Sequence, residues 1–591
     1  MRAAIFPKVI VDDWIVKGGP WVDVRSYDSL ANAVSAIGSS NVTLFIPNTQ
    51  TVSSDLTIPE NITLYFLYPG KITVNSGCTL TINGGIIASL YQIFDGDGTI
   101  TGNPKIEAVY PEWFGAKGDE VTDDAKAFHK CISFIKNAIY NKIILQKTTY
   151  LVTSYQTSNY ILYIDFPVII EGNGAILKKG QDGYCLVIEG TDTNYLDFVE
   201  ISNLEIDGNS KGLQCLTLNY IKKVNFKNIK AHNTATDDCI SIARSEQVSL
   251  NNIEAYEAGS WPLFFHLVND LRVEGFKGYN STADIDVIDI KNCENVKLKN
   301  IIISNSARYG IRIRNSGLKT LKTLFIENVD ITSDWDGISV IADQEDGTSS
   351  DIYSIMLLNI STKRIEVTGY SATPVRCVYV SNLKSEDWGG DYATAFKYSE
   401  IIKIENSYFD KGLYGICNAQ NCKLVSVDGN VIKNVGEGST INRPVISILN
   451  TEHLYVENNV VEGGSKTGYL VEDTSDTKIV PVIKNNKLFN VAELFNGDIY
   501  TTFSDGDTTP SVANKKYFKE ANTSATSITT FDDGISGQEI VIIFTSDDGT
   551  GKSYTTIVHG SGIYLKGGTN VTPDTNTTMS FVYDGSNWYE L

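Results

Sequence analysis

The chain has 591 residues, and its 49 Lys and Arg against 70 Asp and Glu give a formal charge of −21 with His neutral. This acidic balance argues against a nucleic-acid partner, because phosphate binding needs a basic surface, and against an anionic membrane surface. No run of 18 apolar residues occurs, so we expect no membrane insertion. The N-terminal MRAAIFPKVIVDDW becomes charged too early for a secretion signal.

The nine Cys are scattered singly, and no CxxC pair is present. A zinc site or a disulfide framework is therefore not expected. We expect no metal and no cofactor. Most of these Cys lie in apolar runs, where a thiol acts as a small hydrophobic side chain.

Residues 1–110 contain short runs of Val, Ile and Thr, and the stretch TINGGIIASLYQIFDGDGTITGN adds a Gly-rich turn. This composition predicts a β-rich head or attachment region. The next segment, 123–140, has the apolar spacing of an amphipathic helix. Thr122 is its expected N-cap.

The main feature of residues 111–505 is an internal repeat in which an Asn or Gly follows a short run of alternating apolar residues. Its steps run from 23 to 31 residues, anchored on Asn203, Asn228, Asn252, Gly275, Asn300, Asn328, Asn359, Asn382, Asn406, Asn430, Asn459 and Asn486. Several short strands per repeat without an intervening helix predict one turn of a parallel β-helix. A leucine-rich repeat is the alternative, but its fixed leucine frame is absent.

The repeat stops after about residue 505. Residues 506–591 have alternating strands and tight DG, SG and GG turns, which predict a small antiparallel β-sandwich or barrel. We expect this domain to serve trimerisation or glycan binding. Because an open β-helix end exposes unpaired strands, we expect the 123–140 helix to cap one end and this domain the other.

The stretch YPEWFGAKGDEVTDDAKAFHKCI (110–132) resembles the entry motif of the pectate-lyase-like superfamily, which is common in bacteriophage tailspikes, capsule depolymerases and polygalacturonase-like enzymes. The matching residues are Phe114, Gly115, Ala116, Gly118, Asp119, Thr122, Asp123 and Asp124, with Glu120 where Gly is usual. The resemblance implies an all-β, right-handed, single-stranded parallel β-helix. It also implies a homotrimer on a virion tail, acting outside the cell on a bacterial surface polysaccharide.

A narrower match is TDDCISI (236–242), which resembles the GDDCIAI strand of polygalacturonase-type glycoside hydrolases. The resemblance implies roles for Asp237 and Asp238 in acid catalysis and water activation. The chain departs from that family where GSWPLFFH replaces its GHG-type histidine. The family's RIK motif has only an approximate counterpart in Arg312-Ile313-Arg314, and its Asn-Thr-Asp element is reduced to NTA (233–235).

The repeat itself brings distant residues together, because equivalent positions of successive coils stack ~4.8 Å apart and side chains alternate in and out. The outward residues of four successive short strands, from DCISIA to YGIRIRN, should form a patch of His266, Asp289, Lys291, Arg312 and Arg314. The turns before the same strands should stack Asp237, Trp261, Asp286, Tyr309 and Asp336 in a second column. Acids there alternate with aromatics.

Such a column suits a sugar-cleaving groove. Aromatic faces stack on pyranose rings, and two carboxylates supply acid and base. Asp in alternate coils have backbones roughly 10 Å apart, nearer the ~6.5–9.5 Å of inverting than the ~5–5.5 Å of retaining enzymes. Arg312 and Arg314 can hold acidic sugars such as uronates.

Structural explanations apply to the same residues. Asp is common in turns, Asp289 between Arg312 and Lys291 fits an ordinary ion-pair ladder, and His266 fits a solvated face. Exposed Trp261 and Phe264 indicate a binding surface, either for sugar or for a sister chain.

We therefore predict a phage tailspike-like glycoside hydrolase that degrades capsule, lipopolysaccharide or exopolysaccharide, with residues 1–110 contacting other tail proteins. The candidate catalytic residues are Asp237, Asp238, Asp286, Asp289 and Asp336, and the candidate substrate-binding residues are Trp261, Phe264, His266, Tyr309, Arg312, Arg314 and Trp335. A non-cleaving receptor-binding spike or adhesin and a polysaccharide lyase on the same scaffold are the alternatives.

Overall fold

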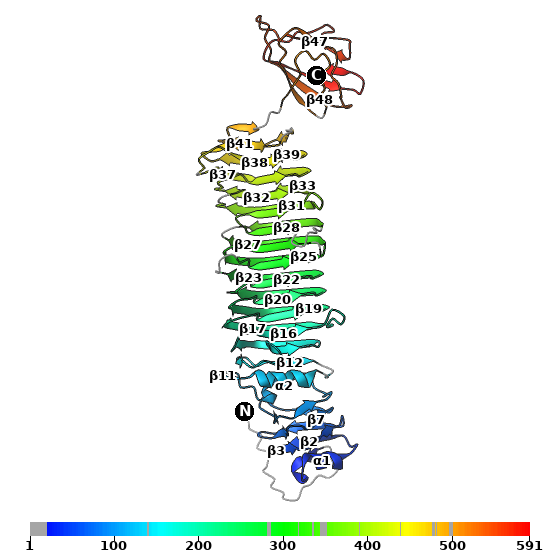
Figure 1. Ribbon diagram of the computed structural model, residues 1–591, viewed down its shortest axis with the longest axis vertical. Helices are drawn as coiled ribbons and strands as arrows, with labels where there is room; N and C mark the ends of the chain where they lie inside the picture. The colour runs from blue at the N-terminus through cyan, green and yellow to red at the C-terminus, as the bar shows by residue number, and fades with distance from the viewer. Residues whose placement is uncertain are drawn as a thin grey trace, which may run out of the picture. The chain divides into compact units, whose positions relative to one another are not determined.

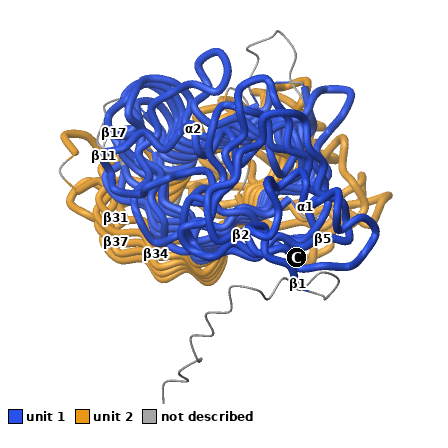
Figure 2. The backbone as a smooth tube through the Cα atoms, turned by 90° about the horizontal axis from the view of Figure 1, so that it is seen from below, with its two compact units in different colours: residues 1–366 blue, residues 367–591 orange. Residues whose placement is uncertain are grey.

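The protein divides into two compact units, residues 1–366 and 367–591 (Figure 2). The computed structural model describes residues 21–136, 138, 141–280, 285–316, 318–333, 336–342, 351–388, 391–437, 439–475, 479, 481–495, 500–513 and 515–591.

Residues 21–110 already wind in parallel coils. Their strands form three parallel sheets, in the orders β1-β2-β5-β8, β3-β6-β9 and β10-β7-β4, and Val42 pairs with Ile62 as Leu56 pairs with Leu80. The strands are β1 (Trp21–Asp23), β2 (Val42–Ile46), β3 (Thr49–Val52), β4 (Leu56–Ile58), β5 (Ile62–Phe66), β6 (Lys71–Val74), β7 (Thr79–Ile82), β8 (Ile86–Ile87), β9 (Phe94–Asp95) and β10 (Thr99–Thr101). Stacked parallel pairing is thus present on both sides of residue 111.

Two α-helices and two short 3-10 helices are described, namely α1 (Leu30–Ile37), α2 (Ala125–Ile135), η1 (Val24–Ser26) and η2 (Pro111–Phe114). The sequence did not predict α1, which is capped by Ser29. Helix α2 (Figure 1) lies inside the predicted segment. It contacts β10 and the later strand β14 (Tyr160–Ile164).

The predicted N-cap of α2 was wrong. The cap residue is Asp124. Thr122 instead belongs to strand β11 (Asp119–Asp123), and its hydroxyl donates a hydrogen bond of 2.9 Å to Asp119. Phe134 of α2 packs against Phe94 and Phe114, with ring centroids 5.9 and 5.7 Å away. The helix therefore joins the first coils to those that follow. Positions 137, 139 and 140 of the predicted helix lie outside the described residues.

From residue 119 to the end of the first unit the coils stack in parallel, and from residue 168 each coil contributes one long and one short strand (Figure 1). The long-strand sheet contains β11 (Asp119–Asp123), β12 (Lys142–Ile144), β13 (Thr149–Val152), β15 (Val168–Lys179), β17 (Val199–Lys211), β19 (Lys223–Thr234), β21 (Gln247–Tyr256), β23 (Asp270–Asn280), β25 (Asn295–Ser306), β27 (Leu321–Ser333) and β29 (Ile352–Ser361). The short-strand sheet contains β14 (Tyr160–Ile164), β16 (Tyr184–Glu189), β18 (Leu216–Asn219), β20 (Ile240–Ala243), β22 (Leu263–His266), β24 (Ile288–Lys291), β26 (Ile311–Asn315) and β28 (Ile338–Ala342). The parallel β-helix is confirmed.

The Asn ladder of the first unit consists of Asn203, Asn228 and Asn252 and, beyond Gly275, of Asn300, Asn328 and Asn359. All these Asn have φ of 54° to 57°, and Gly275 has φ 73°, so each turns the long strand in the left-handed region that Asn and Gly tolerate. Asn228 donates to Asn203 and Asn252 to Asn228, both at 2.7 Å. Gly275 interrupts the ladder, which resumes where Asn328 donates to Asn300 at 3.1 Å.

The second unit continues the same kind of coil. Its strands are β31 (Val375–Glu386), β32 (Thr394–Lys397), β33 (Ser399–Glu405), β34 (Tyr408–Asp410), β35 (Cys417–Gln420), β36 (Leu424–Asp428), β37 (Val431–Val435), β38 (Arg443–Leu449), β39 (His453–Glu457), β40 (Val460–Gly463), β41 (Thr467–Asp473), β42 (Val482–Lys484), β43 (Lys487–Phe489) and β44 (Glu493–Phe495), while β30 (Ile365–Thr368) spans the boundary between the units.

Three repeat anchors in this unit were assigned one residue late. The bends lie at Gly429, Asn458 and Asn485, which have positive φ. Asn430 and Asn459 instead point inward, at 0% and 1% exposure, and Asn430 donates to Asn459 at 2.9 Å.

The C-terminal domain has its own core, in which Trp588 is fully buried and donates to the carbonyl oxygen of Phe531 at 3.0 Å. Its strands are β45 (Thr501–Thr502), β46 (Tyr517–Glu520), β47 (Thr526–Ile528), β48 (Glu539–Phe544), β49 (Thr555–Ile557), β50 (Ile563–Tyr564), β51 (Thr577–Tyr583) and β52 (Trp588–Glu590). The pairs β48–β51 and β51–β52 are antiparallel, whereas β46–β48 and β50–β52 are parallel. The six-stranded sheet is thus mixed. Among the described residues, no helix is long and apolar enough to span a bilayer.

Candidate functional site

The acid–aromatic column lies just before successive strands of the short-strand sheet. Ile240, Leu263, Ile288, Ile311 and Ile338 pair in register. The residues two positions before them therefore stack in the order Asp238, Trp261, Asp286, Tyr309 and Asp336. The alternation of acids with aromatics is as predicted, but the first acid of the column is Asp238 and not Asp237.

Each of the first two acids accepts a hydrogen bond from the next coil. Asp238 accepts the backbone N–H of Trp261 at 3.2 Å, and Asp286 accepts that of Tyr309 at 3.4 Å. Asp238 also accepts from the side-chain amide of Gln214 at 3.1 Å. Since Leu216 pairs with Ile240, Gln214 holds the same column position one coil earlier.

Burial raises the pKa of Asp238 to about 8, and the neighbouring Asp237 adds to this rise. Asp238 is only 2% exposed, whereas Asp237 is half-buried and receives the backbone N–H of Asp238 at 2.9 Å. A carboxyl with this pKa is mostly protonated at neutral pH. It can therefore donate a proton.

The other two acids of the column lie among arginines. Asp286 is 1% exposed, with Arg312 Nη1 at 3.7 Å and Arg308 Nε at 3.9 Å. Burial raises its pKa and the two arginines oppose the rise. Asp336 pairs with Arg364 Nη1 at 2.8 Å. Burial raises the pKa of Asp336, while Arg364 lowers it and Glu366 raises it further.

Asp289 belongs to a second outward column, one step along the strands. It is fully buried, and Arg314 donates to it from Nη2 at 2.5 Å and from Nε at 3.3 Å. Burial raises the pKa of Asp289 to about 6 although Arg314 lowers it. Asp289 thus makes a diagonal pair with Arg314, which the sequence did not predict.

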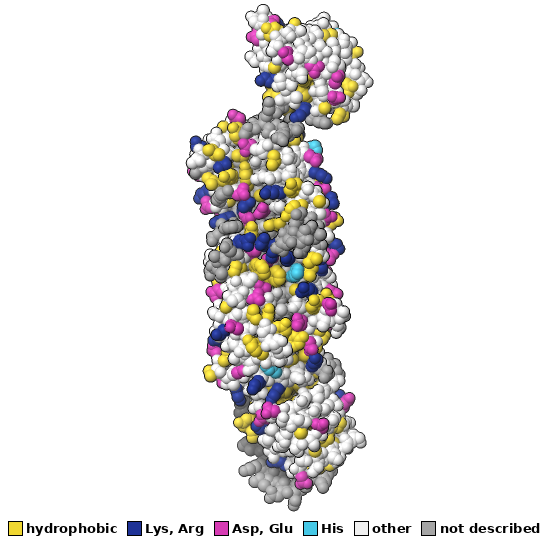
Figure 3. Space-filling model, viewed as in Figure 1, with side chains coloured by type: hydrophobic (Ala, Val, Ile, Leu, Met, Phe, Trp, Pro, Cys, Tyr) yellow, Lys and Arg dark blue, Asp and Glu magenta, His cyan; other side chains and the backbone are white. Residues whose placement is uncertain are grey.

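Aromatic side chains lie beside these charges. Trp261 and Phe264 are half-buried and stack with centroids 4.9 Å apart and planes at 20°. The guanidinium of Arg314 lies 5.7 Å from the Trp261 ring, and Phe264 lies 6.2 Å from the ring of His266. At the level of β22 and β23, hydrophobic, basic and histidine side chains adjoin on the visible surface (Figure 3).

Tyr309 is 9% exposed and carries Arg308 and Arg312 at 5.1 and 5.4 Å from its ring. Burial raises its pKa. Trp335 lies outside the described residues. The structure thus gathers the other predicted site residues on one face of the short-strand sheet, with Asp237 at its edge.

Sequence reasoning missed Gln214, Arg308, Arg364 and Glu366. Counting two residues back from each short strand would have identified Gln214, because Gln214 shares the register of Asp238. Within the described residues no group of His, Cys, Asp or Glu is arranged to hold a metal ion.

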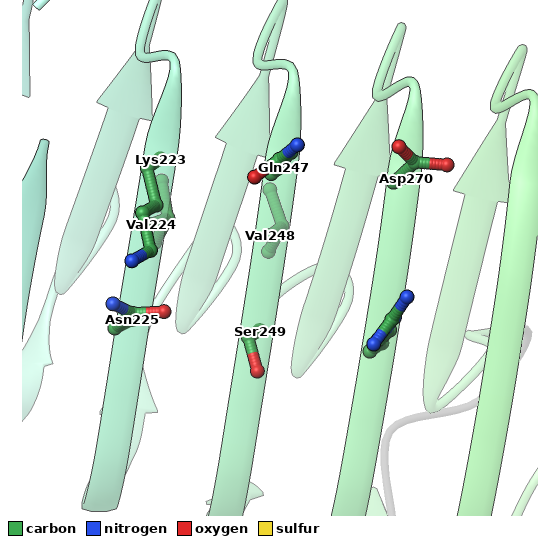
Figure 4. A pocket seen from close by; sticks show the side chains of 8 residues that line it. Lys223, Val224, Asn225, Gln247, Val248, Ser249 and Asp270 are labelled. Atoms are coloured by element: carbon green, nitrogen blue, oxygen red, sulfur yellow. The ribbon is translucent and has the colours of Figure 1, made fainter. Parts of the chain in front are cut away.

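Small pockets also lie on the long-strand sheet. One of about 240 Å³ has side chains from three successive strands, among them Lys223, Gln247 and Asp270 (Figure 4). None of its lining residues belongs to the predicted site.

Residues 502–589 match the family model described as the phage depolymerase C-terminal beta sandwich domain. No curated protein matches the chain.

Solved structures similar to the chain include tailspike protein 3 of bacteriophage CBA120, at 13% identity and TM-score 0.45, covering 69% of this chain and 64% of that one. The family 28 exopolygalacturonase of Yersinia enterocolitica matches at 13% identity and TM-score 0.36, over 66% and 78% of the chains. The A-module of the mannuronan C-5 epimerase AlgE4 of Azotobacter vinelandii matches at 13% identity and TM-score 0.35, over 66% and 97%. Such distant likenesses carry no inference about activity.

The parallel β-helix is the fold that the resemblance of residues 110–132 implies, and the C-terminal match is to a domain described from phage depolymerases.

Proposed function

We propose that this protein is a tailspike-like depolymerase that binds and hydrolyses a bacterial surface polysaccharide, either capsule, lipopolysaccharide or exopolysaccharide. The observation that carries the proposal is the column in which Asp238, Asp286 and Asp336 alternate with Trp261 and Tyr309 in strict register. The C-terminal match to a phage depolymerase domain supports the same class of function.

In the mechanism we favour, Asp238 is the general acid, because its raised pKa keeps it protonated at neutral pH. Asp286 lies two coils further, with its backbone ~10 Å away. That separation favours an inverting reaction, in which Asp286 activates a water on the opposite side of the sugar. Burial raises the pKa of Asp286, and Arg312 and Arg308 oppose this rise and so favour the ionised form that the role needs. Trp261 would stack the sugar ring between the two acids.

The other candidate acids take different parts. Asp237 is the alternative base, as the TDDCISI resemblance implies. Asp289 fixes Arg314 beneath Trp261 and acts as a positioning residue. Asp336 and Tyr309 continue the groove as a further subsite, with Trp335 as a remaining binding candidate.

A non-cleaving receptor-binding spike is the second candidate function, and the near-complete burial of Asp238 and Asp286 favours it. A lyase is less well supported. It would need a base such as Tyr309, and burial raises the pKa of that phenol rather than lowering it.

The deciding experiment incubates the purified protein with a panel of bacterial surface polysaccharides and measures new reducing ends and the absorbance of unsaturated products. We expect reducing ends without unsaturation. Asp238→Asn and Asp286→Asn should abolish them, and Asp197→Asn, an exposed acid paired with Lys222 at 2.7 Å, should not. Binding without cleavage would favour the spike, and unsaturated ends the lyase.

We further propose that the protein is a homotrimer of the virion tail that acts outside the cell and joins other tail proteins through residues 1–110. Trp21 and Tyr68, 59% and 81% exposed, support a contact surface in this region. Light scattering of the full chain tests the trimer, since a monomer would contradict it.

A further inference from the structure

The turn that leads into β18 has a strained backbone. Leu213 has φ of 66°, a left-handed angle that a bulky side chain rarely adopts. Lys179, fully buried at the end of β15, donates from Nζ to the carbonyl oxygens of Gly212 at 2.6 Å and Leu213 at 3.1 Å. Asp182 accepts the backbone N–H of Gly212 at 2.9 Å. Backbone strain that the surrounding contacts hold in place is concentrated at functional sites.

Gln214 follows this turn directly, and its amide is held in one orientation. The hydroxyl of Thr217 donates to Oε1 of Gln214 at 2.5 Å. The other end of the amide, Nε2, donates to Oδ2 of Asp238 at 3.1 Å and to Oδ1 of Asp237 at 3.4 Å. The strained turn thus presents one amide to both carboxyl groups of the next coil.

The coil that follows supplies two more donors to Asp238. The backbone N–H of Trp261 reaches Oδ1 at 3.2 Å. The side chain of Ser260 forms a further hydrogen bond, and both bonds lower the pKa of Asp238. Since the carboxyl group is nearly closed to water, these three donors from the two neighbouring coils take the place of its hydration.

The other influences on Asp238 oppose its ionisation. Burial first, and then Asp237 and Asp289, raise its pKa to about 8. Asp238 in turn raises the pKa of Tyr184 on β16, whereas the buried Lys179 interacts with Asp237. Hydrogen-bond donors act in the opposite direction, because a donated N–H or O–H stabilises the charged form of a carboxyl group.

We propose that Gln214 is a positioning residue that stabilises the carboxylate of Asp238 as this group loses its proton. In the proposed reaction the proton passes to the glycosidic oxygen, and the electrons of the broken O–H bond stay on Asp238. The electrons of the broken C–O bond leave with the sugar oxygen. A donor that is already in place for the developing charge needs no reorganisation. The inference rests on the proposed function, because it assigns a further residue to the same site.

The direct test needs no substrate. Gln214→Met keeps the length of the side chain but donates no hydrogen bond, so it should raise the pKa of Asp238 by about one unit, a tenfold change in the ionisation constant. The free energy of unfolding, relative to the same chain carrying Asp238→Asn, falls as the pH rises above ~4 and levels off at the folded-state pKa. We expect it to level off near pH 8 in the wild type and near about pH 9 in Gln214→Met.

Two further variants complete this test. Gln247→Met is the matched control, because Gln247 lies on the long-strand sheet outside the column, and it should level off as the wild type does. Thr217→Val removes the bond that orients the amide and should give a smaller shift in the same direction. It keeps the test decisive if Gln214→Met does not fold. Levelling off at the wild-type pH in both site variants would overturn the inference.

Activity separates this inference from the proposed function. On a polysaccharide that the wild type cleaves, Gln214→Met should lower kcat about 10-fold or more and move the fall of kcat/KM at high pH upward by about one unit. A pKa shift without cleavage of any polymer supports the role of Gln214 and refutes the hydrolase. Cleavage by the wild type together with an unshifted pKa in Gln214→Met refutes the role of Gln214 and leaves the hydrolase standing.

Discussion

Filling the gap in the Asn ladder should stabilise the protein. Gly275 occupies the ladder position between Asn252 and Asn300, and its φ of 73° suits Asn. A Cβ there would meet the backbone of Asn252 at 3.5 Å, which is ordinary van der Waals contact. In Gly275→Asn, the new amide should donate to Asn252 and accept from Asn300, in the direction that the other ladder amides follow.

The expected gain follows from these two bonds. A net intramolecular hydrogen bond contributes about 0.5–1.5 kcal/mol, and exposed positions lie near the lower end. Replacing Gly also restricts the unfolded chain, worth about 0.4–1 kcal/mol. We expect Gly275→Asn to raise the free energy of unfolding by about 1–2 kcal/mol.

Urea unfolding followed by tryptophan fluorescence measures this change, with Gly275→Ala as the matched control. Ala has the same restricted backbone but no amide, and it should lose about 1 kcal/mol because its Cβ is strained at positive φ. If Asn is no more stable than Ala at this position, the ladder bonds contribute nothing and the reasoning is refuted.

Three further predictions concern the site. Because protonated Asp238 is the proposed acid, kcat/KM should fall as the pH rises through about 8; a profile still flat above this pH would contradict the assignment. The pKa of Asp238 is higher in the folded than in the unfolded state, so protonated Asp238 stabilises the folded state fully below pH ~4, and this stabilisation is lost as the pH rises through about 8. The unfolding free energies of the wild type and of Asp238→Asn should therefore converge at low pH. A difference that stays constant with pH would refute this. Arg314→Met should lower the free energy of unfolding in urea by about 3–5 kcal/mol, because it leaves buried Asp289 without its partner. Adding Asp289→Asn to the same chain should restore part of this loss, and no restoration would mean that the two residues are not coupled.

The β-helix was predictable because its pattern repeats. Asn203, Asn228 and Asn252 have one conformation and one role, so the sequence spacing gives both the bend and the register. The same method assigned the bend one residue too late at Asn430 and Asn459. An Asn that forms a buried ladder cannot be told in the sequence from an Asn at a bend.

The site was predictable in its columns but not in its contacts. The stacking of Trp261 between two acids follows from register alone, whereas the diagonal reach of Arg314 to Asp289 depends on a long, flexible side chain. The column prediction named Asp237 because it counted three residues back from Ile240, whereas the other members of the column lie two residues before their strands. Burial of a polar atom, such as Nε2 of His266, is not visible in an outward sequence position.

The acid spacing has an evolutionary consequence. A gene encoding stacked coils can lose or duplicate one of them without disturbing the pairing of the rest. Deletion of the coil that carries Trp261 would place Asp238 and Asp286 on adjacent coils, ~4.8 Å apart, close to the ~5–5.5 Å of retaining enzymes. In the proposed hydrolase, the loss of one coil would thus be enough to change the spacing of an inverting enzyme to that of a retaining enzyme while leaving the architecture intact.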